Sequence, residues 1–244
     1  MDLVAWYEAY WSAKDDTVDH SRLDLLLPYI QPGQRVFQLD GGPGMLAERM
    51  VRERGAQVVM TDLTQEATRR ARAKSLEASQ LYIGDTDIPH SDASFDAVVS
   101  DSAIEHHFDP ARSFDELARV LKPGGVFLLC LPNAAHWRCR WWLLRGRFPY
   151  VRGTPTDFTH LRFFTLNEIR HWLSDRDIAI QHVDGSASLW VRGLYPAWLR
   201  RPPFATLYVR LAHRFPTFFA RDLIVIGRKG PESTQGLGGL QVEG

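Results

Sequence analysis

Short apolar runs and amphipathic stretches alternate along the first half of the chain. The apolar runs predict five strands, at residues 35–39, 57–62, 81–84, 95–101 and 126–132. Between them the pattern predicts helices at 45–55, 64–79 and 110–121. Strands that alternate with helices through short turns predict an α/β fold, with a parallel sheet covered by helices on both faces.

The pattern changes towards both ends of the chain. Residues 3–30 predict helices, and the alternation breaks after residue 132. A helix is predicted from Thr165, where Glu168 completes a capping box, and strands are predicted at 178–184 and 222–229. We therefore predict one domain over residues 1–230 with a cap insertion at about 134–165. An additional aromatic and basic segment follows at about 189–219, and a disordered tail is predicted at 231–244.

The ends of three predicted strands carry the candidate ligand-binding residues. Ligands in parallel α/β sheets bind at the carboxyl ends of the strands, so these ends should converge on one pocket. The turn after the first strand is rich in glycine, and glycine lets backbone N–H groups approach a ligand closely. Asp62 closes the second strand, where a carboxylate can accept hydrogen bonds from the hydroxyls of a ribose.

Five segments follow one another in a set order. They are VFQLDGGPGML (36–46), VVMTD (58–62), GDTDIPHSDASFDAVV (84–99), SAIEHHFDP (102–110) and ELARVLKPGGVFLLCLPN (116–133). In this order the chain resembles the class I S-adenosylmethionine-dependent methyltransferases, over roughly residues 5–185 and the final strand. The later DFTHLRFFTLNEI (157–169) is similar to a subgroup often associated with small-molecule, sugar and cell-surface glycan methylation.

This resemblance implies a Rossmann-like, seven-stranded, mostly parallel sheet and S-adenosylmethionine as cofactor. The glycine turn would face the methionine moiety of the cofactor, Asp62 the ribose, and Leu63 the adenine. The end of the fourth strand would lie where the methyl group is presented. The implied cofactor-binding residues are Gln38, Asp40, Gly42, Gly44, Asp62, Leu63, Asp85, Thr86, Asp101 and Ser102.

The first turn departs from the family pattern at two positions. The family usually has an acidic residue where this chain has Gln38, and glycine where it has Asp40. In one hypothesis Asp40 takes the place of the first glycine and crowds the cofactor. In the other the acid has moved two residues along the same face of the strand, where it still meets the cofactor's ammonium group. We favour a retained but altered site, because the other implied residues persist.

Catalysis is expected to require a base when the methyl acceptor is a hydroxyl, and histidine is the usual choice. His106 is the best-placed candidate, His160 is the second, and Glu105 completes the candidate catalytic set. The alternative for each is an orienting hydrogen bond or a place in the core. The adjacent His106 and His107 could bind a metal, but no third ligand lies at useful spacing, so no metal is expected.

The predicted cap insertion combines aromatic and arginine side chains, and it has no acidic residue from 134 to 153. Aromatic faces stack on sugars or rings, and arginines bind phosphate or carboxylate groups. We therefore expect a small polar acceptor, in first place a sugar or glycan precursor that is phosphorylated or carrier-linked. Nucleic acid ranks lower as a partner because no recognisable RNA-binding module is present.

Charge is divided unevenly along a chain whose formal net charge is zero. Residues 1–130 hold 13 basic and 21 acidic residues, whereas residues 131–244 hold 16 and 8. Such asymmetry bears on partners rather than on fold. For residues 189–219 three interpretations stay open: an extra packing layer over the sheet, a homodimer surface, or a peripheral membrane contact. Four prolines in that segment weaken the last, because they exclude one long amphipathic helix.

Two cysteines are too few for a disulfide framework, and no secretion signal is visible, so a cytoplasmic enzyme is expected. Two other classes remain as alternatives to a small-molecule methyltransferase. One is a non-enzymatic scaffold or regulatory protein built on the cofactor fold. The other is an RNA or protein methyltransferase.

Overall fold

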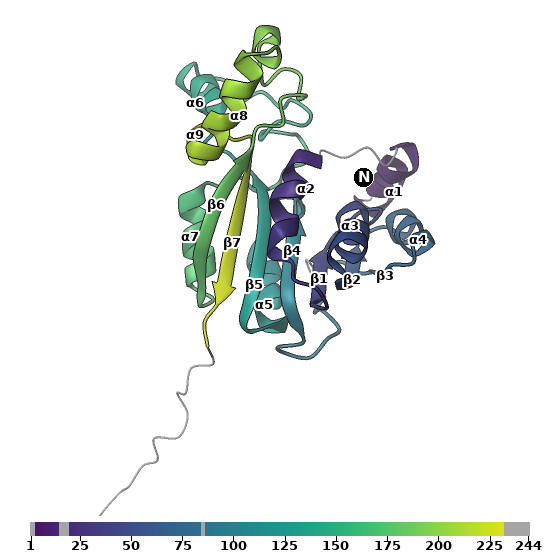
Figure 1. The fold of residues 1–244 in the computed structure, drawn as a ribbon. Helices are drawn as coiled ribbons and strands as arrows, with labels where there is room; N and C mark the ends of the chain where they lie inside the picture. The colour runs from purple at the N-terminus through teal and green to yellow at the C-terminus, as the bar shows by residue number, and fades with distance from the viewer. Residues whose placement is uncertain (1–2, 15–19, 84–85, 232–244) are drawn as a thin grey trace, which may run out of the picture.

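Seven strands form one sheet in the computed structural model, which describes residues 3–14, 20–83 and 86–231 (Figure 1). The strands are β1 (Arg35–Leu39), β2 (Gln57–Asp62), β3 (Glu77–Gln80), β4 (Phe95–Asp101), β5 (Leu121–Pro132), β6 (Ile178–Ser186) and β7 (Asp222–Lys229). Their order is β3-β2-β1-β4-β5-β7-β6. The strand β7 runs antiparallel to both neighbours, and the other pairs are parallel. The predicted seven-stranded, mostly parallel sheet is confirmed.

Helices cover both faces of this sheet. The helices α2 (His20–Leu26), α3 (Met45–Arg54) and α4 (Gln65–Ala73) pack on one face, and α5 (Pro110–Val120) and α7 (Leu166–Ser174) pack on the other. Neighbouring strand residues divide between the two apolar clusters. Val36 packs with α2 and α3, and Phe37 packs with α5 and α7. Because successive side chains of a strand point to opposite faces, the apolar runs are strands buried on both sides.

The third strand lies earlier in the chain than the sequence predicts. β3 is EASQ, paired with β2 from Val59–Glu77 to Asp62–Gln80, whereas LYIG (81–84) is the predicted strand. Three of its four residues are exposed because it lies at the edge of the sheet, so its polar sequence gives no apolar signal. The predicted helix 64–79 is correspondingly too long. Leu81 and Ile83 pack into the core after the strand has ended, and Gly84 lies outside the described residues.

The aromatic and basic segments meet at one end of the sheet. The helix α6 (Trp137–Leu144) lies beside η3 (Ala197–Arg200), α8 (Phe204–Arg214) and α9 (Pro216–Phe219), beyond the ends of β6 and β7 (Figure 1). The buried hydroxyl of Tyr208 joins them, since it accepts a hydrogen bond from Trp137 Nε1 at 2.7 Å and donates one to the Phe219 carbonyl at 2.9 Å. Residues 189–219 therefore form a cluster of their own at the end of the sheet, rather than a further layer over its face. In the described part of the chain, no helix is both long enough and apolar enough to cross a membrane.

The turn between β1 and α3 depends on glycine at two positions. Gly42 and Gly44 have left-handed backbones, with φ of 57° and 79°. A Cβ on Gly44 would lie 2.4 Å from Leu76 Cδ1 and 3.2 Å from Ala71 Cβ, so α3 begins against α4 with no space for a side chain. Close packing of the two helices at this point sets the direction in which the turn leaves β1.

We predict that Gly44→Ala destabilises the protein by about 2–4 kcal/mol. The left-handed backbone accounts for about 1 kcal/mol, and overpacking against Leu76 for about 1–3 kcal/mol more. Gly55→Ala is the matched control, because Gly55 also has a left-handed backbone, with φ of 64°, but a Cβ there would meet nothing within 4 Å. Urea unfolding of the three proteins measures the difference. Equal losses in both variants would show that the contact with Leu76 carries no energy.

Candidate active site

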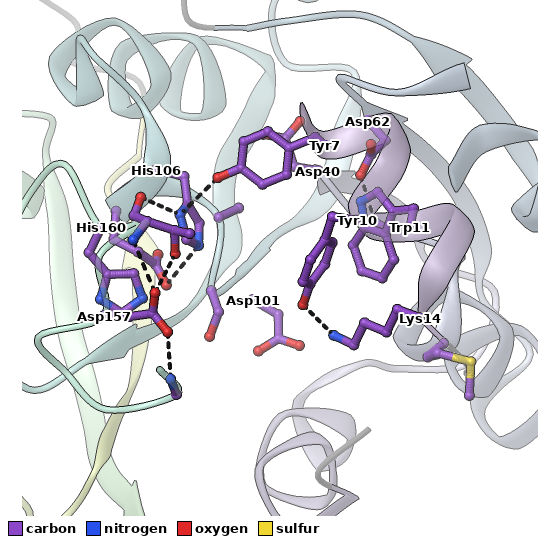
Figure 2. A pocket seen from close by; sticks show the side chains of 18 of the residues that line it. Tyr7, Tyr10, Trp11, Lys14, Asp40, Asp62, Asp101, His106, Asp157 and His160 are labelled. Carbon is purple, nitrogen blue, oxygen red and sulfur yellow. Dashed lines mark hydrogen bonds and ion pairs between the residues drawn. The ribbon is translucent and has the colours of Figure 1, made fainter. Parts of the chain in front are cut away.

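A cavity of about 700 Å³ opens at the carboxyl ends of β1, β2 and β4 (Figure 2). This volume is typical of small-molecule sites. Gly44 does not line the cavity, Thr86 is exposed outside it, and Asp85 lies outside the described residues. The other predicted site residues do line it: Gln38, Asp40, Gly42, Asp62, Leu63, Asp101, Ser102, Glu105, His106 and His160.

The buried carboxylate of Asp62 ties the first turn to the end of β2. Its Oδ2 accepts a hydrogen bond from the backbone N–H of Gly42 at 2.9 Å. Its Oδ1 accepts from the backbone N–H and the hydroxyl of Thr64, at 2.9 and 2.7 Å. Oδ1 already accepts two hydrogen bonds, but Oδ2 accepts only one, so Oδ2 can accept one more from a ligand in the cavity.

The surroundings of Asp62 also shift its ionisation. Burial and the negative charge of Asp40 together raise the pKa of Asp62 to about 6, although the hydrogen bonds from Thr64 and Gly42 oppose the shift. The carboxylate is therefore ionised at neutral pH but protonated in mild acid. A ligand that donates hydrogen bonds to it will bind more weakly as the pH falls.

Asp40 takes the glycine-like conformation of the first turn but directs its side chain to a histidine. Its backbone is left-handed, with φ of 43°. Its Oδ2 lies 2.6 Å from Nε2 of the buried His107, whose Nδ1 lies 2.6 Å from the hydroxyl of Ser113. His107 therefore holds the displaced acid in place, a positioning function that the sequence did not reveal.

Two acceptor oxygens remain for a cationic ligand at this turn. Among the described residues, Gln38 Oε1 and Asp40 Oδ1 are buried without a hydrogen-bond partner, and both residues line the cavity. Buried polar atoms are normally hydrogen-bonded. These two oxygens and the Asp62 carboxylate fit the ammonium group and the ribose hydroxyls of S-adenosylmethionine, so the structure favours a retained but altered turn.

An ion pair also holds the end of β4. Arg22 of α2 lies 2.9 Å from the carboxylate of Asp101, and both side chains are largely buried. The next residue, Ser102, has a left-handed backbone with φ of 54°. That conformation is uncommon outside glycine, and it turns the chain sharply into the 3-10 helix η2 (Ile104–His106). Glu105 and His106 thereby follow β4 directly at the wall of the cavity.

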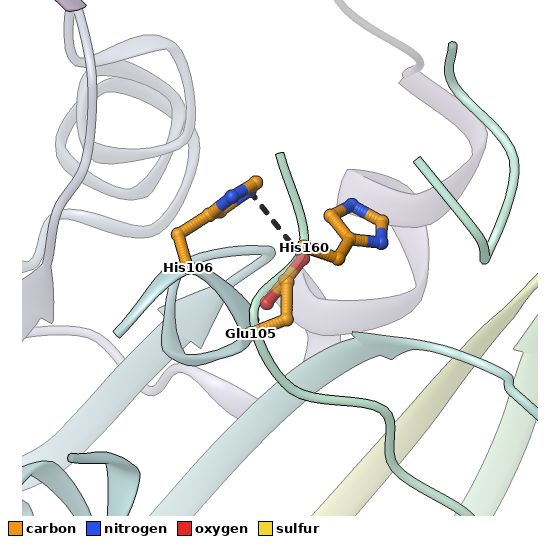
Figure 3. A group of neighbouring side chains, drawn as sticks. All are labelled: Glu105, His106 and His160. Atoms are coloured by element: carbon orange, nitrogen blue, oxygen red, sulfur yellow. Dashed lines mark ion pairs between the residues drawn. The ribbon is translucent and has the colours of Figure 1, made fainter. Parts of the chain in front are cut away.

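Backbone hydrogen bonds fasten the segment before α7 to this helix. The N–H groups of Leu161 and Arg162 donate to the Glu105 carbonyl at 2.9 and 3.1 Å. His160, more than fifty positions later in the chain, is therefore brought beside His106, with ring centroids 5.1 Å apart. The predicted catalytic residues Glu105, His106 and His160 form one group (Figure 3).

The protonated nitrogen of each imidazole is fixed by a backbone carbonyl. His106 Nδ1 lies 2.9 Å from the Thr159 carbonyl, and His160 Nδ1 lies 3.0 Å from the Pro155 carbonyl. Because a carbonyl only accepts, Nδ1 carries the proton in both rings, and each Nε2 keeps its lone pair. Tyr7 of α1 also approaches His106 Nδ1, at 3.2 Å.

Burial makes this group neutral at physiological pH. Burial lowers the pKa of His106. Burial and the neighbouring His106 together lower the pKa of His160 to about 4. Burial also raises the pKa of Glu105 to about 8. Both Glu105 carboxyl oxygens lack a hydrogen-bond partner in the described part of the chain. The histidines can therefore act as bases or ligands, and Glu105 is a buried carboxyl group that the protein leaves unsatisfied.

The helix α1 (Leu3–Ala13) lies within the range 3–30 in which helices were predicted, but its position as one wall of the cavity was not predicted (Figure 2). Trp6, Tyr7, Tyr10 and Trp11 line it, and a Cβ on Gly42 would lie 2.8 Å from the Trp11 ring. Glu8 anchors the helix by accepting hydrogen bonds from the first N–H groups of α4, at 2.5 and 3.0 Å. The aromatic spacing of WYEAYW, at i, i+1, i+4 and i+5, is the signal that predicts one aromatic helix face.

Comparisons with known proteins agree with this architecture. Residues 38–129 match a family model described as a methyltransferase domain. The ubiquinone biosynthesis O-methyltransferase of Xanthomonas oryzae pv. oryzae (strain PXO99A) is 30% identical over 187 residues, which cover 74% of this chain and 72% of the relative. The enzyme of the same name from Xanthomonas campestris pv. campestris (strain B100) is 29% identical over 204 residues, 80% of this chain and 82% of the relative. The crystal structure of an S-adenosylmethionine-dependent methyltransferase from Mesorhizobium loti has a TM-score of 0.61 at 22% identity, covering 88% of this chain and 99% of that one.

A sheet of this order, with a glycine turn after β1 and a carboxylate at the end of β2, defines an α/β methyltransferase. The chain belongs to the class I S-adenosylmethionine-dependent methyltransferase family. It is a methyltransferase, and S-adenosylmethionine is its methyl donor.

We predict that the affinity for S-adenosylhomocysteine rises roughly five- to tenfold between pH 5 and pH 7. Asp62 has a pKa of about 6, so it becomes ionised over this range, and the ionised carboxylate is the form that accepts hydrogen bonds from the ribose. Asp62→Asn should bind the nucleoside roughly tenfold more weakly at pH 7 and lose this pH dependence. Isothermal titration calorimetry measures both, with Asp175→Asn, an exposed residue, as control. An affinity of the unmodified protein that does not change with pH would contradict the placement of the ribose at Asp62.

Proposed function

We propose that the protein methylates a hydroxyl oxygen on the aromatic ring of a small acidic molecule. The observation that supports this best is the lone pair of His106 Nε2, which is oriented through the Thr159 carbonyl at the wall of an aromatic cavity. A phenolic hydroxyl ionises near pH 10 in water, so a base must remove its proton at neutral pH.

The cavity has two chemically different sides. Gln38, Asp40 and Asp62 supply carboxylate and amide oxygens on the strand side, which suits the cationic methyl donor. His106 and His160 lie on the opposite side, towards the cap insertion. A donor bound on the strand side presents its methyl group to an acceptor between α1 and the insertion, and holding the two in line lowers the barrier to transfer.

In the proposed reaction the acceptor oxygen attacks the methyl carbon as its proton passes to His106 Nε2. The bond between the methyl carbon and sulfur breaks, and its electron pair stays on sulfur. The products are a methyl ether, S-adenosylhomocysteine and an imidazolium. Burial disfavours that imidazolium, and the hydrogen bond to Thr159 and the carboxylates of Asp157 and Asp40 oppose this effect only in part.

The walls and rim of the acceptor side support an aromatic acid. Trp6 and Phe158 meet edge to face with ring centroids 5.9 Å apart, so they form one aromatic wall on which a planar ring can stack. Arg152 and Arg192 are exposed at the cavity, and neither has a carboxylate partner in the described part of the chain, so both are available to an acidic group. The two curated relatives are named for ubiquinone biosynthesis O-methylation, which agrees with a ring hydroxyl as acceptor.

A panel of acceptors tests the proposal directly. Transfer of a labelled methyl group is measured from S-adenosylmethionine to dihydroxybenzoic acids, to catechol, which lacks the carboxylate, and to nucleotide-linked sugars. We expect methylation of the aromatic acids, and weaker methylation of catechol because it cannot engage Arg152 or Arg192. Methylation of the sugars alone would overturn the proposal in favour of the sugar acceptor expected from the sequence.

We predict that His106→Gln lowers kcat by roughly 10²- to 10⁴-fold, the usual range for loss of a general base. The dissociation constant for S-adenosylhomocysteine should stay within about twofold, because His106 lies on the acceptor side of the cavity. His171→Gln is the control, since His171 is exposed on α7. A kcat of His106→Gln close to that of the unmodified enzyme would show that His106 removes no proton.

A further inference from the structure

Two imidazoles and a carboxylate converge where η2 meets the segment before α7 (Figure 3). One ligand atom from each of Glu105, His106 and His160 lies within 4.8 Å of the others. Sequence spacing offers no third ligand beside the histidine pair 106–107. The group instead combines Glu105 and His106 with His160, which lies on a segment that backbone hydrogen bonds to Glu105 bring into place, while His107 pairs with Asp40.

We infer that Glu105, His106 and His160 form a binding site for a divalent transition-metal ion on the acceptor side of the cavity. Two histidines and one carboxylate make a donor set that suits Zn²⁺, Co²⁺ or Fe²⁺ better than Mg²⁺, because Mg²⁺ prefers oxygen ligands. Three protein ligands leave at least one coordination position open, and all three residues line the cavity.

The hydrogen bonds of the two histidines prepare them as ligands. Metal-binding histidines usually donate the N–H of the other ring nitrogen to a carbonyl or carboxylate, which fixes the tautomer and the ring orientation. His106 and His160 both do so through Nδ1, to the carbonyls of Thr159 and Pro155. Both Nε2 lone pairs are therefore available, and His106 Nε2 lies 3.9 Å from Glu105 Oε1.

The buried carboxyl group of Glu105 is the second, independent observation. Its residue is only 1% exposed, and neither of its oxygens has a hydrogen-bond partner in the described part of the chain. Leaving such a group unsatisfied is unfavourable, and a cation that binds it removes the cost.

The group must contract slightly to bind an ion. Donor atoms around a tetrahedral ion with bonds of about 2.1 Å are roughly 3.4 Å apart, so a separation of up to 4.8 Å has to close by roughly 1.4 Å. Rotation of the half-buried His106 ring about its side-chain bonds moves Nε2 on that scale. The metal would then polarise the acceptor hydroxyl, and a hydroxyl bound to it would ionise near neutral pH without His106 as base.

The test is binding of Co²⁺ to the chelator-treated full chain, free of any histidine tag, followed by visible absorption and calorimetry. We expect one ion per chain, with a dissociation constant in the micromolar range or tighter. The absorption should have the intensity of a four- or five-coordinate site, and Zn²⁺ should displace the ion but Mg²⁺ should not. Absence of saturable binding, or a spectrum typical of six water-like ligands, would overturn the inference.

Variants connect the ion to this site. His160→Gln and Glu105→Gln should each weaken Co²⁺ binding at least tenfold, whereas the exposed-residue control His171→Gln should bind it unchanged. Circular dichroism establishes that each variant is folded, and if Glu105→Gln does not fold, His160→Gln decides alone. Unchanged binding in a folded His160→Gln protein would refute the site. The outcome is independent of the acceptor, because binding is measured without donor or acceptor present.

Discussion

The carboxylate of Asp62 is the interaction on which the arrangement of the cavity depends. Parallel pairing of β1 with β2 and β4 brings three strand ends to one edge of the sheet, but it does not fix the loops that leave them. Asp62 fixes the first loop by accepting the N–H of Gly42, and it fixes the next by accepting two hydrogen bonds from Thr64. Thr64 in turn caps α4, on which α1 is anchored through Glu8. One buried acid thus connects the glycine turn, two helices and the aromatic wall.

A second constraint brings distant parts of the chain together on the acceptor side. The Glu105 carbonyl accepts two backbone hydrogen bonds from the segment 161–162, and the Thr159 and Pro155 carbonyls orient the two histidines. Backbone groups therefore position Glu105, His106 and His160. Substitution of these side chains can change the chemistry of the group without changing the backbone conformation of the loop. Contacts from another part of the chain also hold the first turn, in which Gln38 and Asp40 differ from the family pattern. The carboxylate of Asp40 lies beside buried His107, and Ser113 of α5 orients that histidine.

The sequence predicted the sheet well because each central strand is an apolar run with clear boundaries, and β2 was predicted at its observed limits. It failed at β3, where an exposed edge strand has no apolar signal. It predicted the position of Asp62 at the cavity but not the hydrogen bonds of Asp62 to Gly42 and Thr64, because these depend on loop geometry rather than on residue type. Motif order predicted that Glu105 and His106 follow β4. It could not predict that the carbonyl of Glu105 binds the segment before α7, because such contacts are encoded by no side-chain pattern. The role of α1 was missed although its aromatic spacing was visible, since spacing alone does not say against what a helix packs.

The acidic first half and the basic second half of the chain both contribute charged side chains to this cavity. The acidic first half supplies Asp40, Asp62 and Asp101 from strand ends, and the basic second half supplies Arg152 and Arg192 from the cap and the segment after β6. The two halves meet across one cavity, with Asp40 and Asp62 at the strand ends and Arg152 and Arg192 at exposed positions of its lining. The sulfonium donor is attracted to the carboxylates, and the proposed acidic acceptor would be attracted to the arginines, so both would be oriented before contact forms. After transfer the donor has lost its sulfonium charge but keeps its ammonium group, so its attraction to the carboxylate side weakens. The same charge separation that orders the reactants therefore also favours release of the demethylated product.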